Sequence, residues 1–281
     1  MEQQLICGFP DQWSEFQKRN EKFLLRLPNL QAALDLAFLR TFDTTGPEDR
    51  TVFMLGRICA EEFYEVALLA ANGYGLGAQR LLRSLYERAV TMAFLSDHPD
   101  QIDAFMNYHA VAQFKLMQAI HQSYEPGILP ESAVEETRRE YEKVKDQFQI
   151  TLCPECKTTR TNHTWHKLDV VSMAKKTIFG PLVIPGYYLP MSQAHSTVHA
   201  MLSRLEETTG GGLGFNPDPQ PKKADGALMT AHNIVLGIIE TQKKFFGLKQ
   251  LEEPLQKCID DFMEIWIKEE SNQDPRRPEG D

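Results

Sequence analysis

Four polar side chains that could take part in acid–base chemistry recur at three- and four-residue steps in one segment: Tyr188, Ser192, His195 and His199. Because an α-helix turns by about 100° per residue, helical geometry would hold them in one line. A second, mainly apolar line runs beside them through Tyr187, Met191, Ala194, Val198, Met201 and Leu205. The pattern predicts a helix whose polar line borders the core and shares a cavity, although the flank of a surface helix has the same pattern.

Two more polar residues interrupt apolar stripes. Glu62 lies in the middle of the stripe of a helix expected over 50–72, and His109 lies in that of a helix expected over 99–123. A buried carboxylate needs a partner or a raised pKa, whereas a core histidine commonly hydrogen-bonds a neighbouring helix. Both residues are therefore candidates for the same cavity, with a purely structural role as the alternative.

Arg83 and Glu87 begin a line that apolar side chains continue along a helix expected over 77–96. This continuation favours a line that faces protein, and an exposed salt-bridge face is the alternative. For Arg80 and Arg88 on the same helix we expect the exposed face. Arg83 and Glu87 therefore join the candidate catalytic residues.

A metal site is a separate possibility. The segment TLCPECKTTRTNHTWHK holds Cys153 and Cys156, then His163 and His166, which are the ligand types of a tetrahedral structural zinc. The two pairs stand closer together than in common zinc fingers, so an exposed hairpin tip without metal is the alternative. No Glu-x-x-His motif of carboxylate-bridged di-metal bundles occurs, and we expect no cofactor apart from this zinc.

The elements that must position these residues are helices. Apolar residues recur at helical spacing and no convincing alternating strand pattern is found, which predicts an all-α fold. We expect a single bundle over 1–270, with an irregular Cys-bearing insert at 150–166, two C-terminal helices within 226–270 and a disordered tail at 271–281. The other helices are expected near 11–42 (interrupted around Pro28), 131–149, 167–178 and 187–207.

Composition narrows the class of function. The 281 residues carry a net charge of −9, which argues against a general nucleic-acid coat while leaving a local basic groove open. No run reaches the ~20 apolar residues that cross a bilayer, and five cysteines at irregular positions do not resemble a secreted disulfide framework. We expect a cytoplasmic protein without membrane contact.

Three stretches together resemble an uncharacterised bacterial all-helical family. They are LLRSLYERAVTMAFLSDHPDQIDAFMNYHAVAQFKLMQ with its Arg-x3-Glu helix, Trp165 before a short helix, and Tyr188-x3-Ser192 followed by histidine. The resemblance covers about residues 50–207. That family is distantly similar to the HEPN domains, all-α bundles that often dimerise and include metal-independent ribonucleases of toxin and antiphage systems.

The resemblance implies a ribonuclease, but the catalytic motif of the HEPN nucleases does not occur at the expected place in this sequence. HEPN nucleases carry Arg, four to six residues, then His, and neither His195 nor His199 has an arginine at that distance. The formal match, Arg160-x5-His166, lies in the Cys-bearing insert. We hypothesise that Arg83 replaces the missing arginine from another helix.

Two classes of function follow as expectations. The first is RNA cleavage by a histidine base with Arg83 stabilising the phosphorane, in a protein that could form a homodimer or pair with a product of the same operon. The second is a binding or sensing module without chemistry, including a zinc-stabilised interaction protein. Ser192 against His195 stands one residue closer than the family spacing, so either histidine remains the candidate base.

Overall fold

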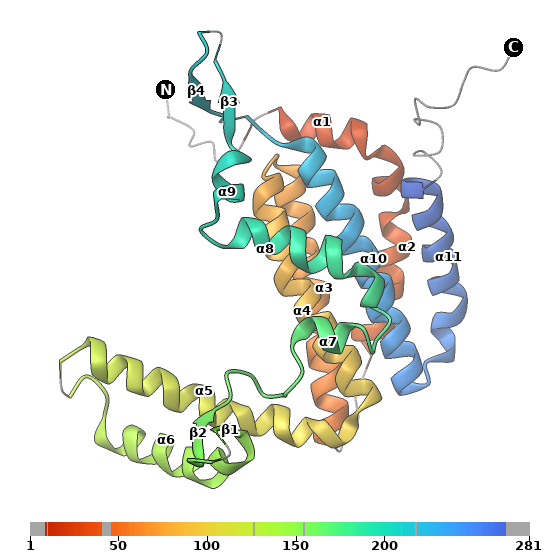
Figure 1. The fold of residues 1–281 in the computed structure, drawn as a ribbon. Helices are drawn as coiled ribbons and strands as arrows, with labels where there is room; N and C mark the ends of the chain where they lie inside the picture. The colour runs from red at the N-terminus through yellow and green to blue at the C-terminus, as the bar shows by residue number, and fades with distance from the viewer. Residues whose placement is uncertain are drawn as a thin grey trace, which may run out of the picture. The chain divides into compact units, whose positions relative to one another are not determined.

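Helices dominate the fold. The computed structural model describes residues 9, 11–40, 46–125, 127–153, 155–208, 210–216 and 218–267, and it is 75% helical (Figure 1). The helical share confirms the all-α class expected from the periodicity. The tail expected at 271–281 lies outside the described residues. Within the described ranges, no helix is both long enough and apolar enough to cross a membrane.

The chain forms two compact units, whereas the sequence led us to expect one bundle. The first unit combines Met1–Ser96 with Met173–Asp281, and the second is Asp97–Ser172. Each unit is described by itself below.

The first unit is built on six helices whose apolar faces meet around α10. Helix α10 packs along α3, α2 and α11, and α1 packs on α2 and α3 (Figure 1). Their bounds are α1 Gln12–Arg19, α2 Glu21–Phe38, α3 Pro47–Ala71, α4 Gly75–Asp97, α10 Pro221–Phe246 and α11 Glu252–Phe262. A short 3₁₀ turn, Lys249–Leu251, leads into α11, and a π-helical turn, Met263–Ile267, extends it.

Helix α10 is the centre of this unit, as its apolar residues on nearly all sides predict. Side chains around most of its circumference are buried, including Leu228, Ile234 and Ile238. Gln242 is buried too, and its Nε2 donates to the Val52 carbonyl of α3 at 2.9 Å. Gly56 permits this close approach, because a Cβ there would lie 2.6 Å from the same nitrogen.

The prediction that the first helix is interrupted around Pro28 is wrong. Pro28 lies inside α2, and the chain breaks at Asn20 instead. The reason is tertiary: the Asn20 amide donates to Asp225 at 3.0 Å, and Arg19 forms an ion pair with the same carboxylate. A helix of this length tolerates one missing amide donor at proline, whereas a side chain bound to another helix can fix the break.

The helix expected over 187–207 is also wrong. A π-helical turn, Ile184–Tyr188, leads into α8 (Leu189–Ala194), the chain is extended at His195, and α9 covers only Val198–Leu202. Residues beyond it pair as the hairpin of β3 (Leu205–Glu207) and β4 (Leu213–Phe215). The 167–178 helix shrinks to α7, Val170–Ala174, followed by the 3₁₀ turn Gly180–Leu182.

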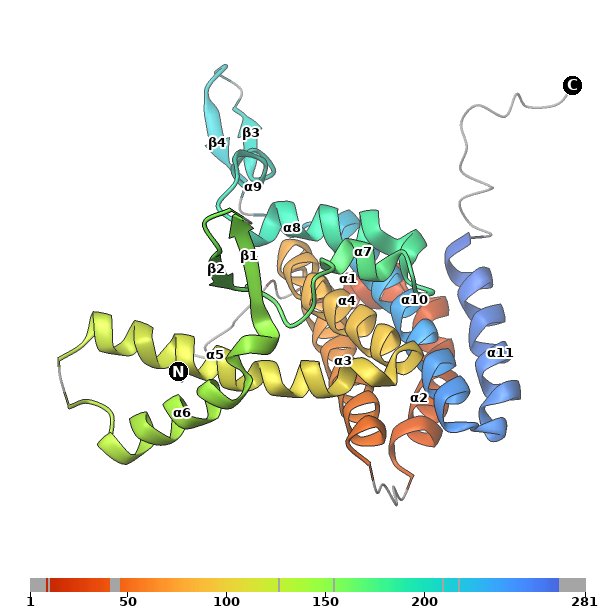
Figure 2. The same cartoon turned by 60° about the horizontal axis from the view of Figure 1, so that its bottom comes forward.

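The second unit pairs two helices and a hairpin. After the 3₁₀ turn Pro99–Gln101, α5 (Ile102–Ser123) runs beside α6 (Glu131–Val144), and the 3₁₀ turn Lys145–Phe148 leads into β1 (Gln149–Cys153) and β2 (Thr158–Thr161) (Figure 2). The rings of Phe114 and Tyr141 stack 4.0 Å apart between the helices. The strands pair antiparallel with a bulge before Cys153. The insert is therefore a β-hairpin, too short for its alternation to be detected in the sequence.

The core stripe expected for the 99–123 helix is only partly buried, since Ile102 at its start is covered and His109 at its centre is not. Met106 and His109 are exposed, whereas Val111 and Met117 are buried. The segment that follows β2 supplies partners for α5: Phe105 packs edge-on against Trp165, and Lys115 donates to the Asn162 carbonyl at 2.8 Å. A two-helix unit covers a narrower face than a bundle does, so the outer edge of the stripe remains exposed.

We predict that His232 makes the first unit sensitive to acid. Its Nδ1 accepts from Trp266 Nε1 at 3.1 Å, and burial lowers the pKa of His232 from 6.5 to about 4. Because the folded state resists protonation, stability is lost as the pH falls from 6.5 toward 4, by roughly 3 kcal/mol for the full shift. Urea unfolding of wild type and His232→Asn across this range should show a shallower pH dependence in the variant.

The matched control is His199→Asn, since His199 is exposed. It should retain the wild-type dependence. Equal slopes for wild type and His232→Asn would contradict the assignment.

Candidate functional site

A buried carboxylate links α3 to α4. Glu62 is only 7% exposed, as its place in the apolar stripe of α3 predicts. Arg88 donates to it twice, from Nε at 3.1 Å and from Nη2 at 2.9 Å, and the Ser84 hydroxyl donates at 2.7 Å. The hydrogen bonds to Glu62 raise the pKa of the Arg88 guanidinium. The buried Glu62 carboxylate is thus both paired with a cation and hydrogen-bonded. The exposed position expected for Arg88 is wrong.

Arg83, which directly precedes Ser84 on α4, contacts residues of three elements. Its Nε donates to Glu87 at 2.6 Å, and its Nη1 lies 2.6 Å from Nε2 of His195. Its guanidinium also lies over the Tyr187 ring, 5.0 Å from the ring centre. A guanidinium cannot accept a hydrogen bond, so it donates to His195 Nε2, which then carries the lone pair. We call Arg83, Glu87 and His195 the Arg–His cluster.

A glycine allows the π-helical turn to approach α4 closely enough for these contacts. A Cβ at Gly186 would lie 2.5 Å from the Tyr86 ring, so a side chain there would push the turn away. The Tyr86 hydroxyl donates to the Phe179 carbonyl at 2.9 Å, which fixes the chain just before the turn. Tyr187 is thereby held beneath the Arg83 guanidinium.

The break after α8 exposes His195. The Thr197 hydroxyl donates to the Ser192 carbonyl at 2.7 Å and accepts from the Ala200 amide at 3.1 Å, so it ends one helix and caps the next. His195 lies in the extended link and lines an open cavity of about 660 Å³. The rest of the lining includes Arg80, Arg204, Met201 and Phe215.

The helix break scatters the expected polar line. The Ser192 hydroxyl donates to the Leu189 carbonyl at 2.7 Å, and Tyr188 is exposed. His199 is exposed on α9, beyond the break. Of the four residues, His195 is the one that contacts Arg83, through Nε2. The helical wheel fails here because it assumes one unbroken helix.

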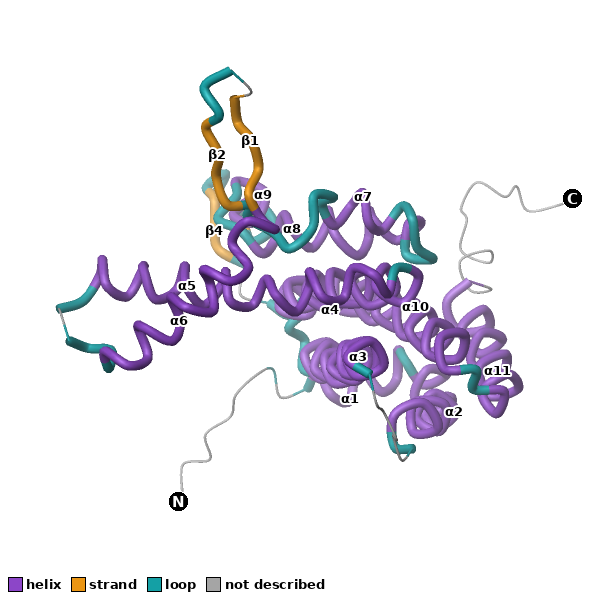
Figure 3. Tube along the Cα trace, turned by 90° about the horizontal axis from the view of Figure 1, so that it is seen from below, coloured by secondary structure: helices purple, strands orange, loops and turns teal. Residues whose placement is uncertain are grey.

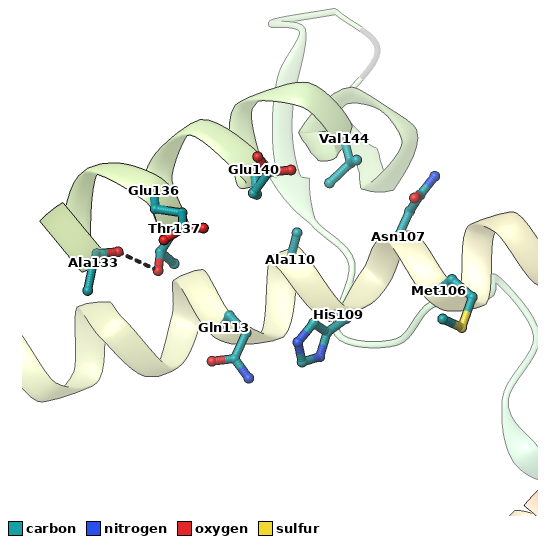
Figure 4. Close-up of a pocket in the computed structure, with 10 residues that line it drawn as sticks. All are labelled: Met106, Asn107, His109, Ala110, Gln113, Ala133, Glu136, Thr137, Glu140 and Val144. Carbon is teal, nitrogen blue, oxygen red and sulfur yellow. Dashed lines mark hydrogen bonds between the residues drawn. The ribbon is translucent and has the colours of Figure 1, made fainter. Parts of the chain in front are cut away.

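His109 belongs to the second unit. It lines an open cavity of about 390 Å³ between α5 and α6, together with Gln113, Glu136 and Glu140 (Figure 4). In the close-up, Ala110 points toward α6 while His109 and Gln113 lie on the opposite edge of α5. His109 is thus an exposed residue of a helix pair, and its expected place in a core is wrong.

The proposed zinc ligands do not gather into one four-residue cluster. Within the described ranges, no group of three or more His, Cys, Asp or Glu side chains is placed to hold a metal ion. Cys153 and Cys156 lie together at the hairpin tip, where the Cys156 amide donates to Cys153 Sγ at 3.5 Å. His166 Nδ1 accepts from the Leu168 amide at 2.9 Å, and His163 Nε2 lies 3.4 Å from Arg160.

The sequence did not lead us to expect that Arg88 and Ser84 bind Glu62, or that Tyr187 lies under Arg83. A signal existed for Arg88, because it shares a helix with Arg83 and a buried Glu62 needs a cation. The cavity residues Arg80 and Arg204 gave no signal, since their approach to His195 depends on where α9 turns.

The arrangement suits recognition of an anion beside a base. The guanidinium presents several N–H donors in a fixed fork, matching phosphate or carboxylate oxygens. The imidazole ring of His195 beside it has a nitrogen that can act as a proton acceptor. Both groups meet next to an open cavity with two further arginines in its lining.

Comparison with protein families identifies the family of this chain. A family model described as a family of unknown function covers residues 50–212, more than half of the chain. This finding confirms the expected likeness to an uncharacterised family, while a HEPN relationship stays a prediction. No curated protein matches, and no solved structure matches.

We predict that Arg88→Met destabilises the first unit. It leaves the Glu62 carboxylate buried with Ser84 as its remaining partner in this cluster, so the free energy of unfolding should fall by about 1–3 kcal/mol. Thermal unfolding followed by circular dichroism measures the change.

The control is Arg57→Met, which removes the exposed Arg57–Glu61 pair of α3. Exposed pairs contribute about 0–1 kcal/mol, so this variant should unfold close to wild type. Equal effects of the two substitutions would show that the Glu62–Arg88 pair lacks the predicted importance.

Proposed function

The chain belongs to the family of unknown function DUF5677, and we propose from the site geometry that it is a metal-independent ribonuclease. The observation that carries the proposal is the 2.6 Å contact between Arg83 Nη1 and His195 Nε2. It joins the anion-binding group and the base that RNA cleavage needs, although they lie 112 residues apart.

In the proposed reaction His195 is the general base. Its ring nitrogen takes the proton of a ribose 2′-hydroxyl, and the resulting oxygen attacks the adjacent phosphorus. The bond to the 5′-oxygen breaks, and that oxygen takes a proton from water. The products are a 2′,3′-cyclic phosphate and a 5′-hydroxyl, and the imidazolium returns its proton to solvent.

Arg83 has two tasks in this scheme. Without RNA it occupies the lone pair of His195 Nε2; a phosphate that takes over the Nη1 donor releases that lone pair to act as base. The same guanidinium then stabilises charge on the phosphorane. Glu87, bound to Nε at 2.6 Å, keeps the guanidinium plane oriented.

The cavity beside His195 supplies features that favour RNA despite the acidic chain. Arg80 and Arg204 lie in its lining, where they can face phosphates. Phe215 lies there as well and is 65% exposed, so its ring is free to stack on an unpaired base. A single-stranded RNA is therefore the substrate class.

A non-catalytic interaction module is the second candidate, and one observation favours it. Apolar side chains crowd the surface of α9 and the following hairpin, with Val198, Met201, Leu202 and Leu213 each more than half exposed. Such a patch is typical of a protein interface, either with a second copy or with a partner encoded nearby. In this case the Arg–His cluster only fixes α8 against α4.

We predict that the purified protein cleaves single-stranded RNA in the presence of EDTA. His195→Ala should lower the rate by about 10²–10⁴-fold, the usual contribution of a general base. Denaturing gels with end-group analysis for 2′,3′-cyclic phosphate measure it. RNA with 2′-deoxyribose at the cleaved position should remain intact.

His199→Ala is the matched control, a histidine four positions along on the exposed face of α9. It should retain activity, and both variants should melt like wild type. Full activity in His195→Ala would overturn the proposal, and RNA binding without cleavage would favour the interaction module.

We also predict an effect in cells, since uncontrolled RNA cleavage is toxic. Induced expression of the wild-type chain in a bacterium should slow growth, in keeping with a toxin or defence protein. Expression of Arg83→Met at the same level should not, because the phosphorane charge loses its stabilising group. Equal growth inhibition by both chains would show that the toxicity does not depend on the Arg–His cluster.

A further inference from the structure

The hairpin of β1 and β2 ends in two cysteines that the proposed ribonuclease does not use. Cys153 closes β1, and Cys156 lies in the turn before β2. The tip extends away from α5 and α6 within the second unit (Figure 3). Its described residues are mostly exposed, so the sulfurs can be reached from outside.

Both sulfurs at this tip have hydrogen-bonding partners within the turn. The Cys156 amide donates to Cys153 Sγ at 3.5 Å, and Cys156 Sγ lies 2.9 Å from the Thr158 hydroxyl. Lys157 has φ 53°, a left-handed conformation that only this non-glycine residue adopts within the described ranges. Such conformations carry strain that the rest of the turn must hold, and here the turn joins the two cysteines to β2.

Both sulfurs are free thiols, so neither is committed to a disulfide bond. Thiolates are the form in which cysteine binds metal ions.

The described chain offers this pair no third ligand. Tetrahedral zinc needs four ligands in a structural site, and no cluster of three potential ligands exists in the part of the chain described. His166 Nδ1 already accepts from the Leu168 amide, and His163 Nε2 lies 3.4 Å from Arg160 Nη1.

We propose that the Cys153–Cys156 hairpin tip is half of a zinc site, completed by the same tip of a second copy of this chain. Two copies related by a two-fold axis present identical pairs, which together make a four-thiolate site. The Lys157 side chains, one from each copy, would offset the negative charge of such a centre. The site would link two second units irrespective of the ribonuclease activity.

Zinc titration of the full-length, reduced and metal-free protein tests the proposal. The expected result is one zinc per two chains, measured by competition with a chromogenic chelator. Cobalt in place of zinc should give the intense absorption of a tetrahedral thiolate site. Cys153→Ser and Cys156→Ser should each abolish both signals while the far-ultraviolet circular dichroism stays unchanged.

Two controls decide how the site is built. The double variant His163→Ala and His166→Ala should retain the wild-type stoichiometry, and so should Glu155→Gln, an exposed neighbour at the tip. Light scattering should show zinc-dependent association that a chelator reverses.

Three results would overturn the proposal. One zinc per chain that disappears in the histidine variant means an intrachain site with mixed ligands. An absence of zinc binding, with a Cys153–Cys156 disulfide forming in air, means a redox pair. Unchanged binding in both cysteine variants places the metal elsewhere.

Discussion

The candidate site depends on one buried charge. Glu62 lies between α3 and α4 at 7% exposure, and Arg88 and Ser84 satisfy its oxygens from α4. Because an unpaired buried carboxylate is costly, this contact fixes the rotation of α4 about its axis and its register against α3. That rotation presents Arg83 and Glu87, which directly precede Ser84 and Arg88 in the sequence, to the segment that follows α7.

The segment from the π-helical turn to α9 completes the site through backbone geometry. Gly186 lets the turn lie against Tyr86, and Thr197 closes α8 and opens α9. Between these two points the Tyr187 ring and His195 Nε2 both contact Arg83. An ordinary helix through this stretch would have kept four polar residues in line, and the observed break selects one of them.

The two polar clusters on α4 differ in how much water reaches them. Arg88 serves a buried carboxylate, and its role is to hold helices together. Arg83 pairs with a half-exposed Glu87 and an exposed His195, so its donors can be transferred to an incoming anion. Two arginines on one helix thus face a buried carboxylate at one position and more exposed partners at the other.

Periodic apolar residues predicted the helical class, the central place of α10 and the burial of Glu62, because they report which helix face is covered. The same pattern put Arg83, Glu87 and His195 among the candidate residues. Contacts between distant segments settled which histidine meets Arg83, that Arg88 is the partner of Glu62, and that the cysteine segment is a hairpin. The physical reason is that local periodicity assumes an unbroken helix, whereas breaks and side-chain partners depend on contacts between segments far apart in the chain.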